Sequence, residues 1–200
     1  MTENDDPSDL LTQGIYFLLL PPGKVRFLRD ASDLGDAEAM RMLDALRAAG
    51  EVNAEDYDRA QHGLLENGRT LAAARALIAR DWPKVGALMN ATHDSLSKLY
   101  AVSCPELDVM VEIAREQPGC LGARMMGGGF GGCVIVLCEP ARAAAVRAKL
   151  EEQYPRRTKD RPGCAPWDLR ATVFATTPGA GAGLTTVTTQ PAEAIKELWE

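Results

Sequence analysis

The stretch LGARMMGGGFGGCVIVLC, residues 121–138, contains five glycines within six consecutive positions. These glycines are Gly127, Gly128, Gly129, Gly131 and Gly132. Such a run is costly to order, because glycine loses more backbone freedom on folding than any other residue. It suits a backbone that takes positive φ angles or that lets another group approach closely. A phosphate bound by backbone N–H groups is the usual group of this kind.

Known fingerprints fit this stretch only in part. Gly127, Gly129 and Gly132 satisfy the pattern G-x-G-x-x-G, but a dinucleotide-binding turn must open a helix. The next residues, CVIVLC at 133–138, form a short β-branched run that is typical of a buried strand. The sequence also lacks H-R-D, D-F-G and G-K-[ST] motifs. The residues alone therefore leave two alternatives open, a phosphate-facing loop and a tight glycine-rich turn between strands.

The wider sequence resembles the C-terminal domain of galactokinases, within the superfamily of galactokinases and homoserine, mevalonate and phosphomevalonate kinases. The resemblance covers residues 24–176 and rests on segments that follow one another in the family's order. These segments are HGLLENGRT at 62–70, LMNATHDSLSKLYAVSCPELD at 88–108 and LGARMMGGGFGGC at 121–133. The resemblance implies a kinase that transfers the γ-phosphoryl group of ATP to the anomeric hydroxyl of galactose with the assistance of Mg²⁺.

The family's N-terminal motifs do not occur in this chain. Galactokinases carry a sugar-binding signature, G-R-x-N-L-I-G-E-H-x-D-Y, and a nucleotide loop, G-x-G-L-S-S-S, and neither is present here. The family's catalytic Asp and its neighbouring Arg belong to the same N-terminal half, so no residue of this chain receives a catalytic or metal-binding role. The resemblance assigns the five glycines to the nucleotide and phosphate cleft. Met126 stands where the family usually has Thr, so it does not carry over a hydroxyl contact there.

The sequence thus predicts the C-terminal half of a galactokinase-like sugar kinase that is inactive without an N-terminal half. ATP and Mg²⁺ would then be bound only together with that half, which is also the predicted protein partner. Two alternatives stay open. The chain could be a catalytically dead interaction or regulatory module, or it could belong to another sugar kinase of the same superfamily.

Composition narrows the partners and the compartment. The 22 basic and 28 acidic residues give a net charge of −6, which argues against nucleic acid and anionic membranes as partners. The five cysteines include no C-x-x-C pair, so zinc is not expected and the pattern is typical of reduced cytoplasmic thiols. The apolar stretch at 15–20 is too short to span a bilayer.

We predict an α+β fold with an antiparallel sheet and helices packed on one face. Residues 1–23 are expected to be a disordered leader outside the family, 24–177 the kinase C-terminal domain, and 178–200 a flexible tail. Apolar periodicity predicts helices at 38–48, 56–80, 82–99 and 140–154, and strands at 121–126, 133–138 and 167–176. The predicted core face of 56–80 carries Tyr57, Ala60, Leu64, Leu71, Ala74 and Ile78. The predicted inward side of 167–176 carries Trp167, Leu169, Ala171, Val173 and Ala175. A polar loop is expected at 155–163.

Two local features carry further expectations. Ser103 and Glu106 spell S-x-x-E, which predicts a capping box at the start of a helix that ends before Pro118. His62 and His93 are the two histidines of the chain. Lone histidines are more often structural or exposed than catalytic, so a structural role is favoured over that of a proton carrier.

Overall fold

The computed structural model describes residues 35–177, and residues 1–34 and 178–200, with the predicted leader and tail, lie outside the described part. Helices flank a two-stranded antiparallel sheet, so the predicted α+β fold is confirmed. The elements follow in the order α3 (Asp36–Ala48), α4 (Ala54–Ile78), α5 (Trp82–Lys98), α6 (Pro105–Arg115), β1 (Cys120–Met126), β2 (Cys133–Cys138), the 3-10 turn η1 (Pro140–Arg142) and α7 (Ala143–Lys159).

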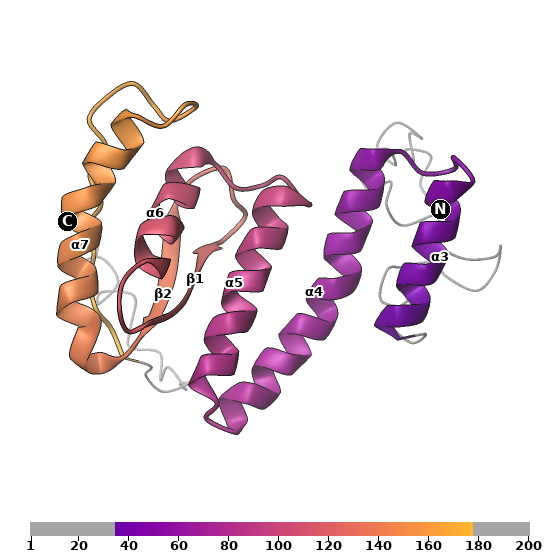
Figure 1. The fold of residues 1–200 in the computed structure, drawn as a ribbon, viewed down its shortest axis with the longest axis horizontal. Helices are drawn as coiled ribbons and strands as arrows, with labels where there is room; N and C mark the ends of the chain where they lie inside the picture. The colour runs from indigo at the N-terminus through magenta and orange to yellow at the C-terminus, as the bar shows by residue number, and fades with distance from the viewer. Residues whose placement is uncertain (1–34, 178–200) are drawn as a thin grey trace, which may run out of the picture.

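The elements stand side by side in one row (Figure 1). From α3 the row runs through α4 and α5 to the sheet, and α7 closes it at the other end. The main core lies where α6 and α7 cover one face of the sheet. Its fully buried members include Val111 and Ile113 of α6, Ala123 of β1 and Leu150 of α7. A second, smaller cluster joins α3 to the first half of α4 through residues such as Leu43 and Leu64.

The backbone of α5 touches the backbone of β1 at a pair of glycines. A Cβ atom at Gly86 would lie 2.1 Å from the carbonyl oxygen of Leu121, and one at Gly122 would lie 2.2 Å from the carbonyl oxygen of Gly86. Any side chain at either position would therefore push the helix off the strand. This crossing fixes the start of α5 against the start of β1.

Further along α5, two of its side chains accept hydrogen bonds from backbone N–H groups on the edge of β1 that does not face β2. The Oδ1 of Asn90 accepts a hydrogen bond from the backbone N–H of Ala123 (2.9 Å), and Nδ1 of His93 accepts one from Met125 (3.2 Å). Arg115 of α6 completes this edge by donating to the carbonyl oxygen of Ala123 (3.1 Å). An unpaired strand edge would otherwise leave these backbone groups unsatisfied in the core.

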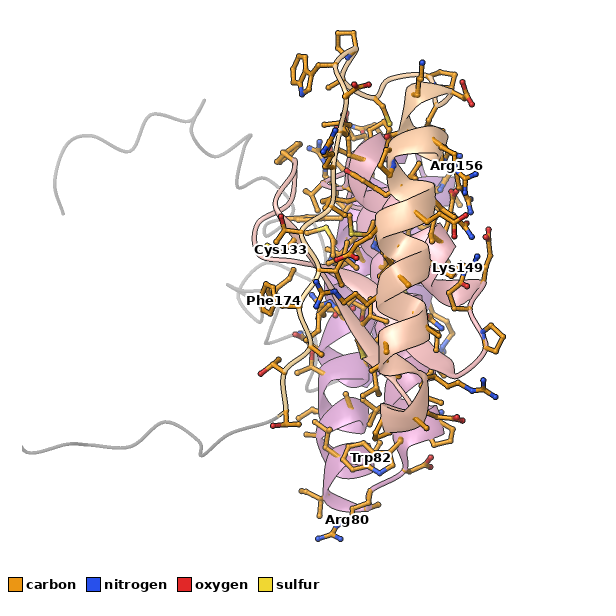
Figure 2. The ribbon with its side chains drawn as sticks, turned by 90° about the vertical axis from the view of Figure 1, so that its left-hand side faces the viewer. Arg80, Trp82, Cys133, Lys149, Arg156 and Phe174 are labelled. Carbon is orange, nitrogen blue, oxygen red and sulfur yellow. The ribbon has the colours of Figure 1, made fainter. Side chains whose placement is uncertain are left out.

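The long helix α4 is buried differently from the predicted face. Periodicity places Leu71, Ala74 and Ile78 toward the core, but all three are exposed, whereas Ala76 is buried. The cause is the neighbouring structure, because α3 packs against the first half of α4 and not against its second half. The junction of α4 and α5, marked by Arg80 and Trp82, projects at one end of the molecule (Figure 2).

The capping box predicted at Ser103 and Glu106 is wrong. Cys104 is the N-cap residue of α6, and it makes no side-chain cap hydrogen bond. The hydroxyl of Ser103 donates instead to Oδ1 of Asp108 (2.6 Å), and the carboxylate of Glu106 accepts from the backbone N–H of Ala165 (2.8 Å). Ser103 is thus occupied by a carboxylate of the same helix and Glu106 by a tertiary partner, so neither side chain forms the predicted cap.

The polar loop predicted at 155–163 is wrong in its first half, because α7 continues through Pro155 to its end at Lys159. The hydroxyl of Thr158 donates to the carbonyl oxygen of Tyr154 (2.7 Å), one turn beyond the hydrogen bond that the proline removes. Arg157 also forms an ion pair with Glu116 of α6 (2.7 Å). These contacts offset the cost of a proline inside the helix.

The strand predicted at 167–176 does not form. The segment has no regular secondary structure, although Leu169, Ala171 and Val173 pack against the main core as their alternation predicts. Trp167 and Ala175, assigned to the same side, are exposed. Alternation reports which side chains face the core, but a strand also requires hydrogen bonds to a neighbouring backbone.

Candidate functional site

The glycine loop, residues 127–132, joins β1 to β2 at one end of the sheet. The two strands match the predicted ones closely, and they pair from Cys120 opposite Cys138 to Met126 opposite Cys133. Four of the five glycines have φ angles that other residues rarely adopt, and the non-glycine Phe130 also has a positive φ, 60°. These glycines are Gly127 (87°), Gly129 (92°), Gly131 (135°) and Gly132 (100°).

The surroundings of the glycines divide the loop into an open part and a packed part. A Cβ atom at Gly127, Gly128, Gly131 or Gly132 would meet no atom within 4 Å. At Gly129, in contrast, it would lie 2.1 Å from the carbonyl oxygen of Val102. The same oxygen accepts a hydrogen bond from the backbone N–H of Phe130 (2.7 Å). The centre of the loop therefore rests on the connection between α5 and α6, and its flanks border open space.

Exposed apolar side chains continue from the loop onto the sheet. The register places Met126 opposite Cys133 and Arg124 opposite Ile135, so these residues share the face that points away from the main core. The side chains of Met126, Phe130, Ile135 and Phe174 are between 47% and 78% exposed. Figure 2 shows Cys133 and Phe174 on the side opposite to Lys149 and Arg156. Met126, Phe130, Ile135 and Phe174 are called the apolar face below.

Both histidines are buried and hydrogen-bonded, in agreement with a structural role. Nδ1 of His62 lies 2.8 Å from the hydroxyl of Ser95, and its ring stacks on Tyr100 with 4.7 Å between the centroids. Burial lowers the pKa of His62 below its ordinary value, although Glu66 raises it. His93 is hydrogen-bonded to Met125, near the end of β1 that leads into the glycine loop.

A polar group around Asp108 supports the loop from below, and sequence reasoning missed it. Oδ1 of Asp108 accepts from the hydroxyl of Ser103 (2.6 Å) and lies 3.3 Å from Nε2 of His93. Oδ2 accepts from the hydroxyl of Ser97 (3.0 Å). The sequence feature that could have indicated it is the occurrence of SCPELD together with the glycine run. The S-x-x-E pattern within SCPELD suggested a helix cap instead.

Residues 35–177 contain no group of three or more His, Cys, Asp or Glu side chains arranged to hold a metal ion. No chemical step is therefore assigned to a metal held by this part of the chain alone. The described helices also include none that is long and apolar enough to cross a membrane.

Comparison with known proteins gives matches in sequence and in fold. The family model described as GHMP kinases C terminal matches residues 73–156. The galactokinase of Canis lupus familiaris is 46% identical over 113 residues, which cover 56% of this chain and 29% of the dog protein. The galactokinase of Thermotoga maritima is 44% identical over 128 residues, covering 60% of this chain and 36% of that protein.

A solved structure extends the likeness to three dimensions. The crystal structure of Lactococcus lactis galactokinase complexed with galactose matches with a TM-score of 0.62 and 31% sequence identity. The match covers 78% of this chain and 39% of that chain.

Residues 73–156 are thus similar to the C-terminal domains of GHMP kinases, and the fold of the described part is similar to that of a galactokinase. The domain is galactokinase-like, as the sequence resemblance predicts. The chain spans only 29% and 36% of the two curated galactokinases described above.

Proposed function

We propose that this chain supplies the C-terminal half of a galactokinase-like sugar kinase and that it has no activity without an N-terminal half. The observation that carries the proposal is the glycine loop, in which Gly127, Gly128, Gly131 and Gly132 border open space. Their positive φ angles explain Gly127, Gly131 and Gly132 in a turn of any kind. Gly128 has neither a positive φ angle nor an atom within 4 Å of its Cβ position, so a turn built for packing alone gives no reason for glycine there.

The five glycines are the proposed nucleotide and phosphate cleft. Phosphoryl transfer requires mainly positioning and charge stabilisation, and backbone N–H groups in a glycine-rich concavity supply both. ATP is the proposed phosphoryl donor, and Mg²⁺ would neutralise its phosphates when bound. Mg²⁺ usually keeps few protein ligands and binds through the phosphates of its substrate, so we expect the ligands of the ion to come from the nucleotide and from the other half of the site.

An N-terminal half is the proposed partner of the apolar face. Contiguous exposed apolar side chains are uncommon on monomeric proteins and mark interaction surfaces. Of this face, Phe130 belongs to the glycine loop itself and Met126 directly precedes the loop. A partner docked on the apolar face would therefore stand beside the loop and close the cleft over it.

Galactose is the proposed phosphoryl acceptor, an assignment inferred from the similarity to galactokinases. Met126, 51% exposed at the entry to the loop, has no hydroxyl to offer to a sugar or a phosphate. Recognition of the sugar is expected to come from the N-terminal half. A panel of hexoses separates a galactokinase from another sugar kinase of the superfamily.

The proposal is tested by joining the N-terminal part of the Thermotoga maritima galactokinase to this chain in one polypeptide. Galactose-dependent formation of ADP is then measured in the presence of ATP and Mg²⁺. We expect turnover by the fusion protein and none by either part alone, because neither part holds a complete cleft. The reference is the intact Thermotoga maritima enzyme, prepared and assayed in the same way.

The contradicting result is a fusion protein that is folded, by circular dichroism and a cooperative melt, but phosphorylates no hexose. If the separate chains nevertheless copurify, the chain is an interaction module that does not complete a kinase. If they neither copurify nor turn over substrate, the apolar face has another role.

A further inference from the structure

Two hydrogen bonds hold the glycine loop, one at its entry and one at its centre. The groups that accept them are both connected to the carboxylate of Asp108. The first place is its entry, where the backbone N–H of Met125 donates to Nδ1 of His93 (3.2 Å). Met125 is fully buried and is the last residue but one of β1. A buried N–H without an acceptor is costly, so this bond fixes where the strand ends and the loop begins.

The bond to Met125 determines which nitrogen of His93 carries the proton. A ring nitrogen that accepts a hydrogen bond cannot be protonated, so the proton of a neutral His93 must lie on Nε2. Nε2 faces Oδ1 of Asp108 at 3.3 Å, where a negative charge favours that same proton position. Asp108 thereby selects the tautomer that can hold β1.

The second place is the centre of the loop, where the carbonyl oxygen of Val102 accepts from the N–H of Phe130 and contacts Gly129. The next residue, Ser103, donates its hydroxyl to Oδ1 of Asp108 (2.6 Å). The side chain of Ser97 donates to the other oxygen of the same carboxylate (3.0 Å). Asp108 thus connects the support beneath the entry of the loop with the support beneath its centre.

We propose that His93 and Asp108 are positioning residues of the glycine loop. Asp108 holds His93 in the Nε2–H tautomer and anchors Ser103, while Nδ1 of His93 holds the N–H of Met125. The two residues fix the orientation of the open glycines without contacting any ligand of the loop. The role can be measured on the chain alone and goes beyond the proposed kinase function.

The arrangement responds to pH with a defined sign. His93 is surrounded by Asp94 of its own helix, by Asp108 and Arg115 of α6, and by Arg124 of β1. Burial lowers the pKa of His93 below its ordinary value of 6.5, although Asp108 raises it. At neutral pH the ring is therefore uncharged and accepts from Met125. Protonation at lower pH turns Nδ1 into a donor, and the bond to the strand is lost.

The direct test is nuclear magnetic resonance on the full chain labelled with ¹⁵N. At pH 7.5 the ring shifts of His93 should show an unprotonated Nδ1 and a protonated Nε2. The amide of Met125 should exchange with solvent slowly, and its protection should fall by about tenfold or more when the pH is lowered through the titration of His93. The Nδ1–H tautomer, or protection of Met125 that stays constant through this titration, would overturn the proposal.

Variants of His93 separate positioning from simple packing. The amide oxygen of His93→Asn falls near the place of Nδ1 and can still accept from Met125, whereas His93→Leu has no acceptor. We expect His93→Asn to keep the protection of Met125 and to remove its dependence on pH, and His93→Leu to lose the protection by about tenfold or more. Equal protection in the two variants would contradict the assignment. If His93→Leu does not fold, the wild-type tautomer and the pH response decide.

The serines bonded to Asp108 provide a matched pair for the second support. Ser103→Ala and Ser97→Ala each remove one hydrogen bond to the same carboxylate, but Ser103 alone is adjacent to Val102. Ser103→Ala should reduce the protection of the Phe130 amide, and Ser97→Ala should leave it unchanged. Equal effects on Phe130 would contradict the link through Asp108. Because none of these readouts uses turnover, a failed kinase assay would leave them intact.

Discussion

At the scale of single residues, the glycine loop combines the two roles that the sequence leaves open. Gly129 permits close packing against Val102, while the other four glycines border open space. Gly128 is distinctive because it alone among the five has no positive φ angle. Replacement of Gly128 by Ala therefore introduces neither backbone strain nor a collision, which makes this residue the cleanest probe of the loop.

Gly129→Ala should destabilise the domain, in contrast to Gly128→Ala. At Gly129 the substitution combines a φ of 92° with a Cβ atom 2.1 Å from Val102, so we expect a loss of at least about 1 kcal/mol in the free energy of unfolding. Gly128→Ala should change this free energy by less than about 0.5 kcal/mol. Urea denaturation of both variants checks the contrast. Equal stabilities would show that the loop does not rest on Val102.

The composition of the glycine site could be predicted from the sequence, but its support could not. The glycine run is continuous in the chain, so its conformational demands are visible in the letters alone. The support depends on Ser103, His93 and Asp108, whose partners are set by the packing of α5 and α6 against β1. A local pattern assigned Ser103 to a helix cap because such patterns contain no information about other acceptors, here the carboxylate of Asp108.

At the scale of elements, the glycine pair Gly86 and Gly122 decides how α5 lies on β1. The helix approaches the strand so closely that backbone meets backbone. This approach brings Asn90 and His93 within reach of the outer edge of β1. The crossing of the two elements is therefore a precondition for the support of the glycine loop.

Two glycine-to-alanine substitutions in helices should have opposite signs. Gly86→Ala places a Cβ atom 2.1 Å from the carbonyl oxygen of Leu121, which is backbone and cannot move aside, so we expect a loss of about 1–3 kcal/mol. Gly68→Ala in α4 meets only the carboxylate of Asp36, which can rotate away, and the better helix propensity should add up to about 1 kcal/mol. Thermal melts compare both with the parent, and destabilisation by both variants would contradict the account.

Periodicity predicted the helices and the two paired strands well. It failed where contacts with other elements determine the secondary structure. The extension of α7 beyond Pro155 depends on ion pairs to α6, which no pattern in residues 155–163 contains. The strand predicted at 167–176 does not form for the opposite reason, because the local pattern is present but the partner is not. Its alternation is real, since Leu169 and Val173 pack on the core, but no hydrogen-bonded backbone partner accompanies it.

At the scale of the whole molecule, the two buried histidines make stability depend on pH. Burial lowers the pKa of His62 and of His93 below the ordinary value of 6.5. Below pH 6.5 the histidines of the unfolded chain bind protons more readily than those of the folded chain. The contribution of the two histidines to the free energy of unfolding is therefore fully present above pH 6.5 and is lost as the pH falls. Glu106, whose pKa is lowered by hydrogen bonds from backbone N–H groups, contributes in the more acidic range below 4.5.

The free energy of unfolding should therefore fall when the pH is lowered from 7.5 to 5.5. The slope can reach about 1.4 kcal/mol per pH unit for each histidine that is neutral when folded and protonated when unfolded. Urea denaturation at several pH values measures it, and His93→Asn should give a smaller slope. A free energy that stays flat or rises over this interval would contradict the burial of both rings.

The apolar face and the open glycines lie together on this domain, and the proposed function gives both the same purpose. Packing within residues 35–177 leaves Phe130 and Phe174 exposed and the flanks of the loop uncovered. A second half docked there would cover the apolar side chains and bring its nucleotide loop to the glycines.

The most direct test of this claim is the activity of the fusion protein that carries Gly128→Ala. A methyl group at this open position obstructs only a ligand that approaches the loop, so we predict a fall in kcat/KM of at least about tenfold with an unchanged melting temperature. The control is the fusion protein with Lys149→Ala, because Lys149 lies on the side of the domain opposite to Cys133 and Phe174 (Figure 2). Unchanged turnover by the stable Gly128→Ala fusion protein would contradict the claim that the glycine loop forms the phosphate cleft.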